Sequence, residues 1–359
     1  MADTPMQATP TPDARPPRRW LKWASRAAQV LLAVLIVYFV YISVATQLKK
    51  SNFLALHFSV GYLVVSWVVI GLYYVLFAVG LTLVIRALGY RPRFRDIFKL
   101  SYATNLGKYV PGGVWQVAGK VALAKQAGVD RHAALVASVV ESAVSVTGGL
   151  LLFLTTTLLG GPYPASLPKW PLFVLIAVIF VALQPQIFAR VVRLAMRLLH
   201  VEGEPPHLRF GQTVWLVFYY AGTWLVAGAG FWLFTRALTS DPGANWIVYS
   251  GFYAAASVGG LLVLFAPAGL GVREGFLALL MRDVVAGGAA TAVIVAFAAR
   301  VWSTAMELAL SAGAVAMPFS HRPADAEPPP AALTAAAVDP PDSAGQPAAV
   351  VPPEGGEDR

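Results

Sequence analysis

Charged side chains inside long apolar stretches are the residues of this sequence that could do chemistry. Glu141 interrupts "VASVVESAVSV", and Arg300 and Glu307 interrupt "FAARVWSTAMELAL". A charge near the bilayer centre costs about 2.5–3.5 kcal/mol on insertion scales, so such residues usually face the protein interior, pair, and line a pathway. We expect Glu141 and Arg300 to occupy comparable places in two halves of the chain and to face one polar cavity. The alternatives are a buried structural ion pair, or pairing of Arg300 with Glu307 along one helix.

Two Pro-Gly breaks interrupt other apolar segments. Proline lacks a backbone donor and disrupts a helix, whereas glycine permits turns that other residues resist. A helix that begins after such a break attracts anions at its N-terminus. The alternative is that the glycines only allow helices to pack closely. The residues expected to act as hinges or cavity walls are Pro111, Gly112, Gly113, Pro267, Gly269 and Gly271.

Polar side chains flank both breaks and complete the predicted site. Arg273 follows the second break directly, and its positive charge suits a lipid phosphate. Lys108 precedes the first break and Lys120 follows it, and either phosphate contact or snorkelling toward the cytoplasmic interface explains the two lysines. The predicted substrate-binding residues are Lys108, Tyr109, Gln116, Glu141, Arg273, Glu274, Arg300 and Glu307.

The composition is typical of an integral membrane protein. The chain is 57% hydrophobic and 13% charged, whereas soluble domains carry about 25% charged residues. It contains no cysteine, and its five histidines are scattered, so we expect no thiol chemistry, metal or other cofactor. The net charge of +9 fits basic loops that face anionic lipid. No nucleic-acid-binding module is recognisable, so we expect no nucleic-acid partner.

The apolar stretches predict an all-α integral membrane protein with about six full transmembrane helices. About 20 apolar residues cross a hydrocarbon core of about 30 Å. The expected spans are residues 27–46, 60–85, 133–159, 170–188, 213–234 and 289–316. Arg-rich loops at 86–95 and 190–209 then fall on the cytoplasmic side, together with both termini.

The segments around the two breaks predict re-entrant helical hairpins. The arms cover residues 96–107 and 114–127 around the first break, and 245–264 and 272–285 around the second. An arm of about 12–15 residues extends only about 18–22 Å, which is too short to cross comfortably. Each hairpin lies between two long helices, and the two sets run in opposite directions. We therefore predict an inverted repeat, with a chance match as the alternative.

The chain divides into three predicted regions. Residues 1–26 form a disordered basic N-terminus, and residues 319–359 form a disordered, acidic tail rich in Pro and Ala. The membrane domain between them, residues 27–318, contains repeat one at about 60–160 and repeat two at about 212–317.

Four motifs resemble those of the lysylphosphatidylglycerol synthase transmembrane-domain family, also called flippase-like integral membrane proteins. The motifs are "NLGKYVPGGVWQ", "VVESA", "PAGLGVREG" and "AAR", and the resemblance covers residues 54–318. The family often has Glu-Arg in the acidic span, but here Ser142 follows Glu141. The resemblance implies a multi-spanning fold that moves or holds lipids. Its best-understood members add a cytosolic aminoacyl-transferring domain, which we do not find here, so we expect no synthase activity.

These features predict translocation of a phospholipid or lipid-linked headgroup, with an anionic headgroup as partner, across the cell (inner) membrane. No phosphate-binding loop is present, so transport would be passive, ion-coupled or driven by a partner. One alternative is a membrane-embedded lipid-modifying transferase, against which stands the lack of a recognisable catalytic motif. Another is a non-transporting lipid-binding subunit. A partner enzyme and a homo-oligomer are both compatible with the sequence.

Overall fold

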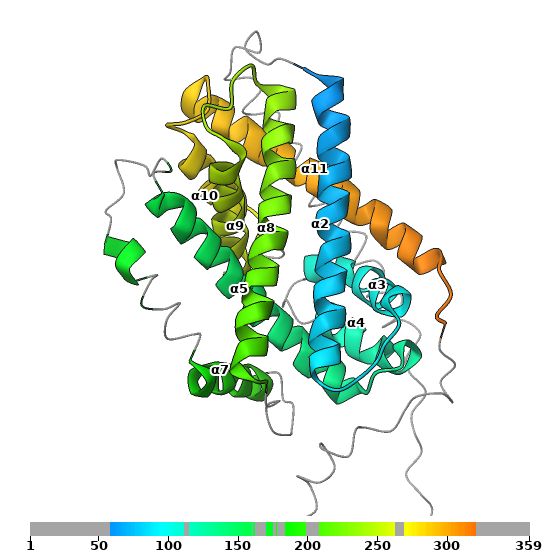
Figure 1. The fold of residues 1–359 in the computed structure, drawn as a ribbon. Helices are drawn as coiled ribbons and strands as arrows, with labels where there is room; N and C mark the ends of the chain where they lie inside the picture. The colour runs from blue at the N-terminus through cyan, green and yellow to red at the C-terminus, as the bar shows by residue number, and fades with distance from the viewer. Residues whose placement is uncertain are drawn as a thin grey trace, which may run out of the picture. The chain divides into compact units, whose positions relative to one another are not determined.

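The structure, a computed structural model, describes residues 58–110, 115–159, 161, 170–174, 177, 184–198, 208–262 and 269–320. Within these ranges the regular elements are all helical (Figure 1). In chain order, those with described bounds are α2 (Val60–Ala87), α3 (Phe94–Ala103), η2 (Asn105–Tyr109), α4 (Trp115–Leu123), η3 (Ala124–Ala127), α5 (Arg131–Leu158), α7 (Pro185–Leu198), α8 (Phe210–Leu238), α9 (Trp246–Leu262), α10 (Val272–Met281) and α11 (Gly288–Ala316). Residues 170–174 and 177 are helical as well. Four of them, α2, α5, α8 and α11, are long and apolar enough to cross a membrane.

These four helices correspond to four of the six expected spans. Their ends lie within a few residues of the expected bounds, because uninterrupted apolar runs of this length favour a helix through the bilayer. The expected span at 27–46 lies outside the described residues, and the one at 170–188 is described only at 170–174, 177 and 184–188, where α7 begins at Pro185. The chain is a multi-pass membrane protein.

Helix α7 corrects one expectation, because part of the segment assigned to an Arg-rich loop is helical. Pro185 occupies the first position of α7, where a missing backbone donor costs nothing. The side chains of Arg190, Arg193 and Arg197 are exposed. Their spacing of three and four residues puts them along one side of the helix. A run of arginines in the sequence is therefore compatible with a helix and need not indicate a loop.

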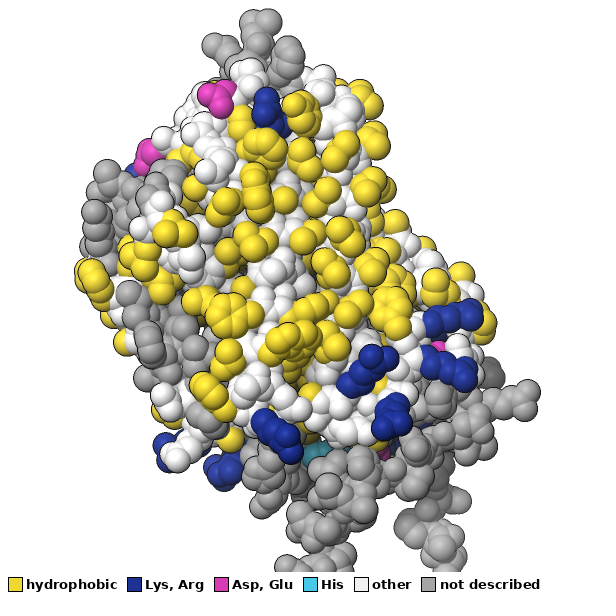
Figure 2. Space-filling model, viewed as in Figure 1, with side chains coloured by type: hydrophobic (Ala, Val, Ile, Leu, Met, Phe, Trp, Pro, Cys, Tyr) yellow, Lys and Arg dark blue, Asp and Glu magenta, His cyan; other side chains and the backbone are white. Residues whose placement is uncertain are grey.

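Helices α2 and α8 pack side by side in opposite directions (Figure 1). The backbone N–H of Ser59, just before α2, donates to the carbonyl of Ala237 near the end of α8 at 2.9 Å. Hydrophobic side chains cover the outward face of this pair, and Lys and Arg side chains gather at one end of it (Figure 2). Exposed arginines where α2 ends and α8 begins are Arg86, Arg91, Arg93, Arg95 and Arg209.

Helix α3 contacts the residues that directly follow α11. The Nζ atom of Lys99 donates to the carbonyl oxygen of Met317 and lies 4.5 Å from the centroid of the Phe319 ring. The backbone N–H of Ser320 donates to Oδ1 of Asp96 at 2.7 Å. These contacts hold α3 in place, and α3 contributes two side chains to the cavity described below.

A glycine sets the distance between α8 and α9. A Cβ atom added at Gly228 of α8 would lie only 2.0 Å from Cα of Ser250 on α9. Small residues let helices in membranes approach this closely. Because Ser250 is fully buried and its hydroxyl already bonds the carbonyls of Leu225 and Trp246, it has little freedom to move.

Gly228→Ala is therefore expected to destabilise the protein by about 1–3 kcal/mol, the usual cost of overpacking. Thermal unfolding in detergent, followed by circular dichroism, measures the loss. Gly222→Ala on the same helix is the matched control, because an added Cβ there meets nothing within 4 Å. Equal stability of the two variants would contradict the packing argument.

Candidate functional site

A cavity of about 250 Å³ lies among the helices. Its wall comes from α2, α3, η2, α4, α5, α8, α9, α10 and α11, so residues far apart in the sequence meet there. The lining residues are Tyr73, Tyr74, Phe77, Ser101, Tyr102, Asn105, Lys108, Gln116, Val117, Lys120, Ser138, Glu141, Ser142, Ser145, Val146, Trp224, Tyr253, Ser257, Val258, Leu261, Arg273 and Glu307. Apolar and aromatic side chains with a few charged groups are typical of a ligand-binding site.

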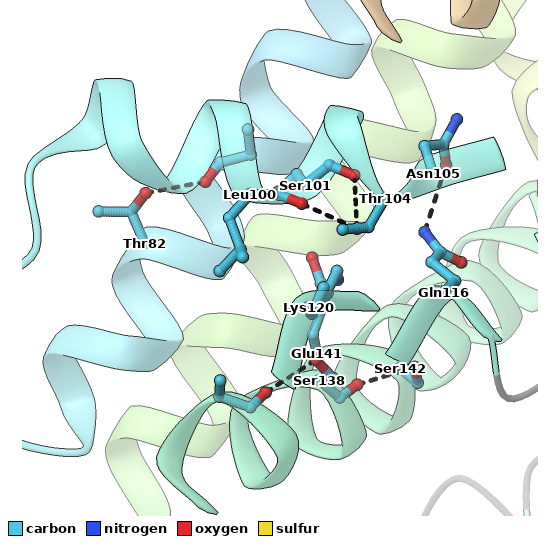
Figure 3. Close-up of polar contacts among 12 residues, drawn as sticks. Thr82, Leu100, Ser101, Thr104, Asn105, Gln116, Lys120, Ser138, Glu141 and Ser142 are labelled. Carbon is cyan, nitrogen blue, oxygen red and sulfur yellow. Dashed lines mark hydrogen bonds and ion pairs between the residues drawn. The ribbon is translucent and has the colours of Figure 1, made fainter. Parts of the chain in front are cut away.

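One wall of the cavity carries a buried ion pair between α4 and α5 (Figure 3). Lys120 Nζ lies 2.8 Å from Oε2 of Glu141, and the two side chains are only 8% and 5% exposed. The hydroxyl of Tyr220 approaches the other carboxylate oxygen at 3.5 Å. Because both charges are removed from water, loss of either side chain would leave the other as a buried charge without its partner, which is costly.

Glu307 is the centre of a second buried network. Its Oε1 atom accepts from Lys108 Nζ at 2.7 Å and from the Tyr74 hydroxyl at 2.7 Å. Its Oε2 atom accepts from the Tyr109 hydroxyl at 2.8 Å. Glu307 therefore joins α11 to α2 and to η2, and its negative charge is balanced by Lys108.

A third ion pair lies beside the cavity. Nη1 of Arg300 is 3.6 Å from Oε1 of Glu274, and its guanidinium carbon lies 5.4 Å from the centroid of the Tyr109 ring. The other Glu274 oxygen accepts from the backbone N–H of Gly271 at 2.8 Å, at the N-terminus of α10. A carboxylate in this position stabilises the first turn of a helix. Glu274 therefore has a structural role in this arrangement.

Arg273 is the third cationic residue among the described residues that line the cavity. Its guanidinium carbon lies 4.7 Å from the centroid of the Tyr253 ring. Among the described residues, no carboxylate lies within ion-pair distance of it. Lys108 is balanced by Glu307 and Lys120 by Glu141, so the described residues of the cavity wall keep one net positive charge, carried by Arg273.

Three residues that line the same cavity have a buried polar atom without a hydrogen-bond partner among the described residues. Ser101 Oγ, Asn105 Nδ2 and Ser257 Oγ are buried without a hydrogen-bond partner in the described part of the chain. The oxygen of the Asn105 amide already accepts from Gln116 Nε2 at 3.2 Å (Figure 3). Buried polar groups are normally satisfied by protein, water or ligand. These atoms are therefore available to a polar group that occupies the cavity.

Five of the eight predicted substrate-binding residues line the cavity, and the other three lie next to it. The five are Lys108, Gln116, Glu141, Arg273 and Glu307. Tyr109 touches Glu307, and Arg300 and Glu274 form the neighbouring pair. Glu141 lines the cavity and Arg300 lies beside it, and among the described residues Arg300 forms no ion pair with Glu141 or with Glu307. Glu141 pairs with Lys120, Glu307 with Lys108 and Arg300 with Glu274.

The predicted set omits Lys120 and an aromatic wall formed by Tyr73, Tyr74, Tyr102, Trp224 and Tyr253. Lys120 follows Gln116 by four residues, so the two share a helix face. This spacing could have placed Lys120 in the predicted site together with Gln116. The adjacent tyrosines in the middle of α2 were a second signal. Tyrosine in membrane helices is enriched near the interfaces, so a central pair indicates a polar interior.

The predicted hinge residues are described only in part. Pro111, Gly112, Gly113 and Pro267 lie outside the described residues. Gly269 and Gly271 adopt φ values of 66° and 81°, which favour glycine. A Cβ at Gly269 would also lie 2.7 Å from the carbonyl oxygen of Gly260 on α9. This close approach brings the start of α10, and with it Arg273, against α9.

Comparison with known proteins agrees with the sequence motifs. Residues 26–310 match the family model described as the lysylphosphatidylglycerol synthase TM region. The match includes every helix from α2 to α10, most of α11, and all residues that line the cavity. A search of curated proteins finds no match.

Proposed function

Because this chain belongs to the family of the lysylphosphatidylglycerol synthase TM region, we propose that it binds the headgroup of a membrane lipid in the cavity and moves that lipid between leaflets. The family and the membrane-spanning helices support a membrane protein of lipid metabolism or translocation. Translocation is the finer proposal, and it rests on the chemistry of the cavity.

The observation that carries this proposal is that Arg273 lines the cavity and has no carboxylate within ion-pair distance among the described residues. A phosphodiester bears one negative charge and accepts the paired N–H donors of a guanidinium. Ser101 and Asn105 supply further polar atoms around the cavity. A phospholipid headgroup fits this combination, since it supplies the missing anion and its acyl chains remain in the apolar phase.

The order of the helices supports an inverted repeat. Helix α2 is followed by the short helices α3 and α4 and then by the long α5, whereas α8 is followed by α9 and α10 and then by the long α11. The first helices of the two sets, α2 and α8, run in opposite directions. We interpret α3–α4 and α9–α10 as re-entrant hairpins whose shared interface holds the site, as in many transporters.

The basic ends of the helices support an orientation. Arginines at the end of α2 and the start of α8 lie at the same end of this antiparallel pair. Under the positive-inside rule this end faces the cytoplasm. The proposed location is the cell membrane, with both termini in the cytoplasm.

Leaflet exchange in vesicles tests the proposal. The purified chain is reconstituted with a trace of fluorescent phosphatidylglycerol, and a membrane-impermeant quencher reports how quickly inner-leaflet lipid reaches the outside. We expect exchange well above that of protein-free vesicles. Formation of a modified lipid would instead favour a transferase, and lipid binding without exchange would favour a lipid-binding subunit.

A further inference from the structure

Two residues that line the cavity are exposed in the described structure. Of the described residues that line it, only Ser142 on α5 and Leu261 on α9 are exposed, Leu261 by 54%. We call the part of the wall formed by Ser142 and Leu261 the lateral mouth. The remaining lining side chains are buried or partly buried.

Glycine contacts hold α5 and α9 closely together next to the lateral mouth. A Cβ at Gly149 would lie 3.0 Å from Cγ2 of Val258, and one at Gly251 would lie 2.1 Å from Oγ1 of Thr156. The two helices therefore run antiparallel and are pressed together over the second half of α5. Ser142 lies about two turns before Gly149, beyond this tight contact, and α9 ends just after Leu261.

The depth of the lateral mouth decides what can occupy it. Helix α5 is a candidate membrane span, and Ser142 lies eleven residues after its first residue, Arg131. At 1.5 Å per residue this is about 16 Å along the helix. The hydrocarbon core of a bilayer is about 30 Å thick, so we expect the lateral mouth to lie at the level of the acyl chains.

The two sides of the lateral mouth suit an amphiphile. The Ser142 side continues inward through Ser138 to the ion pair of Glu141, and the Ser142 hydroxyl donates to the carbonyl of Ser138 at 2.9 Å (Figure 3). The Leu261 side is apolar. The lateral mouth therefore has polar side chains on α5 and an apolar side chain on α9.

We propose that the lateral mouth is the acyl-chain site of this protein: when a headgroup occupies the cavity, the chains leave between α5 and α9 across Ser142 and Leu261. This inference rests on the proposed function and adds the route by which the lipid is held. It commits to the acyl chains of the same lipid whose phosphate contacts Arg273, because the lateral mouth is continuous with the cavity that Arg273 lines.

Bulky substitutions in the lateral mouth test this site in the vesicle assay. Leu261→Trp and Ser142→Trp are each expected to slow exchange of fluorescent phosphatidylglycerol about tenfold, equivalent to about 1.4 kcal/mol in the barrier. Val301→Trp is the control, because Val301 is 50% exposed on α11 and does not line the cavity. Thermal unfolding of each variant shows that the fold is retained.

A second measurement does not depend on exchange. Phosphatidylglycerol with a diazirine in one acyl chain is photolysed in the vesicles, and the adducts are located by mass spectrometry. Adducts near Ser142 and Leu261 should decrease severalfold in Arg273→Gln, whereas adducts at the lipid-facing Leu72, which is 50% exposed, should not change. The difference separates lipid held by the cavity from bulk lipid.

The outcomes distinguish the two proposals. Adducts in the lateral mouth that depend on Arg273, without exchange, would support the acyl-chain site and overturn translocation. Exchange that is unaffected by either Trp variant, with adducts independent of Arg273, would overturn the acyl-chain site and leave translocation standing. Neither exchange nor Arg273-dependent adducts in the wild-type protein would overturn both.

Discussion

Arg273→Gln is expected to lower lipid exchange about 10- to 100-fold. A hydrogen bond to a charged group contributes about 1.5–3 kcal/mol, and each 1.4 kcal/mol is a factor of ten. Glutamine keeps a polar side chain of moderate size but removes the one cation of the cavity wall that has no carboxylate partner among the described residues. The rate of fluorescent phosphatidylglycerol exchange in vesicles measures the effect.

Two further variants make the Arg273 prediction specific. Arg273→Lys keeps the charge but loses the planar fork that binds a phosphodiester with two parallel bonds, so partial activity is expected. Arg95→Gln removes an exposed arginine of α3 outside the cavity and should retain wild-type exchange. If Arg273→Gln exchanges lipid as fast as Arg95→Gln does, the cavity does not bind its ligand through this charge.

Glu141→Gln is expected to destabilise the protein by about 3–5 kcal/mol, because it leaves the buried Lys120 without its counter-charge. Lys120→Met should cost a similar amount by leaving Glu141 uncompensated. The double variant should recover much of the lost stability, since it buries neither charge. Unfolding in mixed micelles, arranged as a double-mutant cycle, measures the coupling between the two residues.

An exposed lysine provides the matched control for this cycle. Lys125 lies in η3, shortly after α4, and its side chain is exposed. Lys125→Met should change the free energy of unfolding by less than about 0.5 kcal/mol, as surface substitutions usually do. Additive effects of the Lys120 and Glu141 substitutions would show that the pair is not energetically coupled.

The transmembrane helices were predictable because each depends on its own stretch of sequence. The expected span at 60–85 is α2, Val60–Ala87, and the expected span at 289–316 is α11, Gly288–Ala316. In the bilayer every backbone group must be paired within its own segment, so an apolar run of sufficient length is helical whatever surrounds it. The Pro-Gly break gave the start of α10 at Val272, and the expected arms 245–264 and 272–285 contain α9 and α10.

The sequence predicted most charged residues of the candidate site, but not which of them form ion pairs. Burying Glu141 or Glu307 is costly, so each carboxylate indicated a polar interior by its position in the sequence alone. Which cation balances which carboxylate depends on how η2 and α4 lie against α5 and α11. That packing joins segments far apart in the chain, and side-chain spacing within one helix contains no information about it.

The sequence by itself therefore determined that this is a helical membrane protein, which described helices are long and apolar enough to cross the bilayer, and which charges are too costly to face lipid. Those properties follow from local hydrophobicity and from the cost of burying a charge. Only the tertiary structure decided that Glu141 pairs with Lys120 and Glu307 with Lys108, leaving Arg273 as the net charge of the described lining residues. Electrostatic balance is a property of distances in space, and the packing of helices distant in the chain sets those distances.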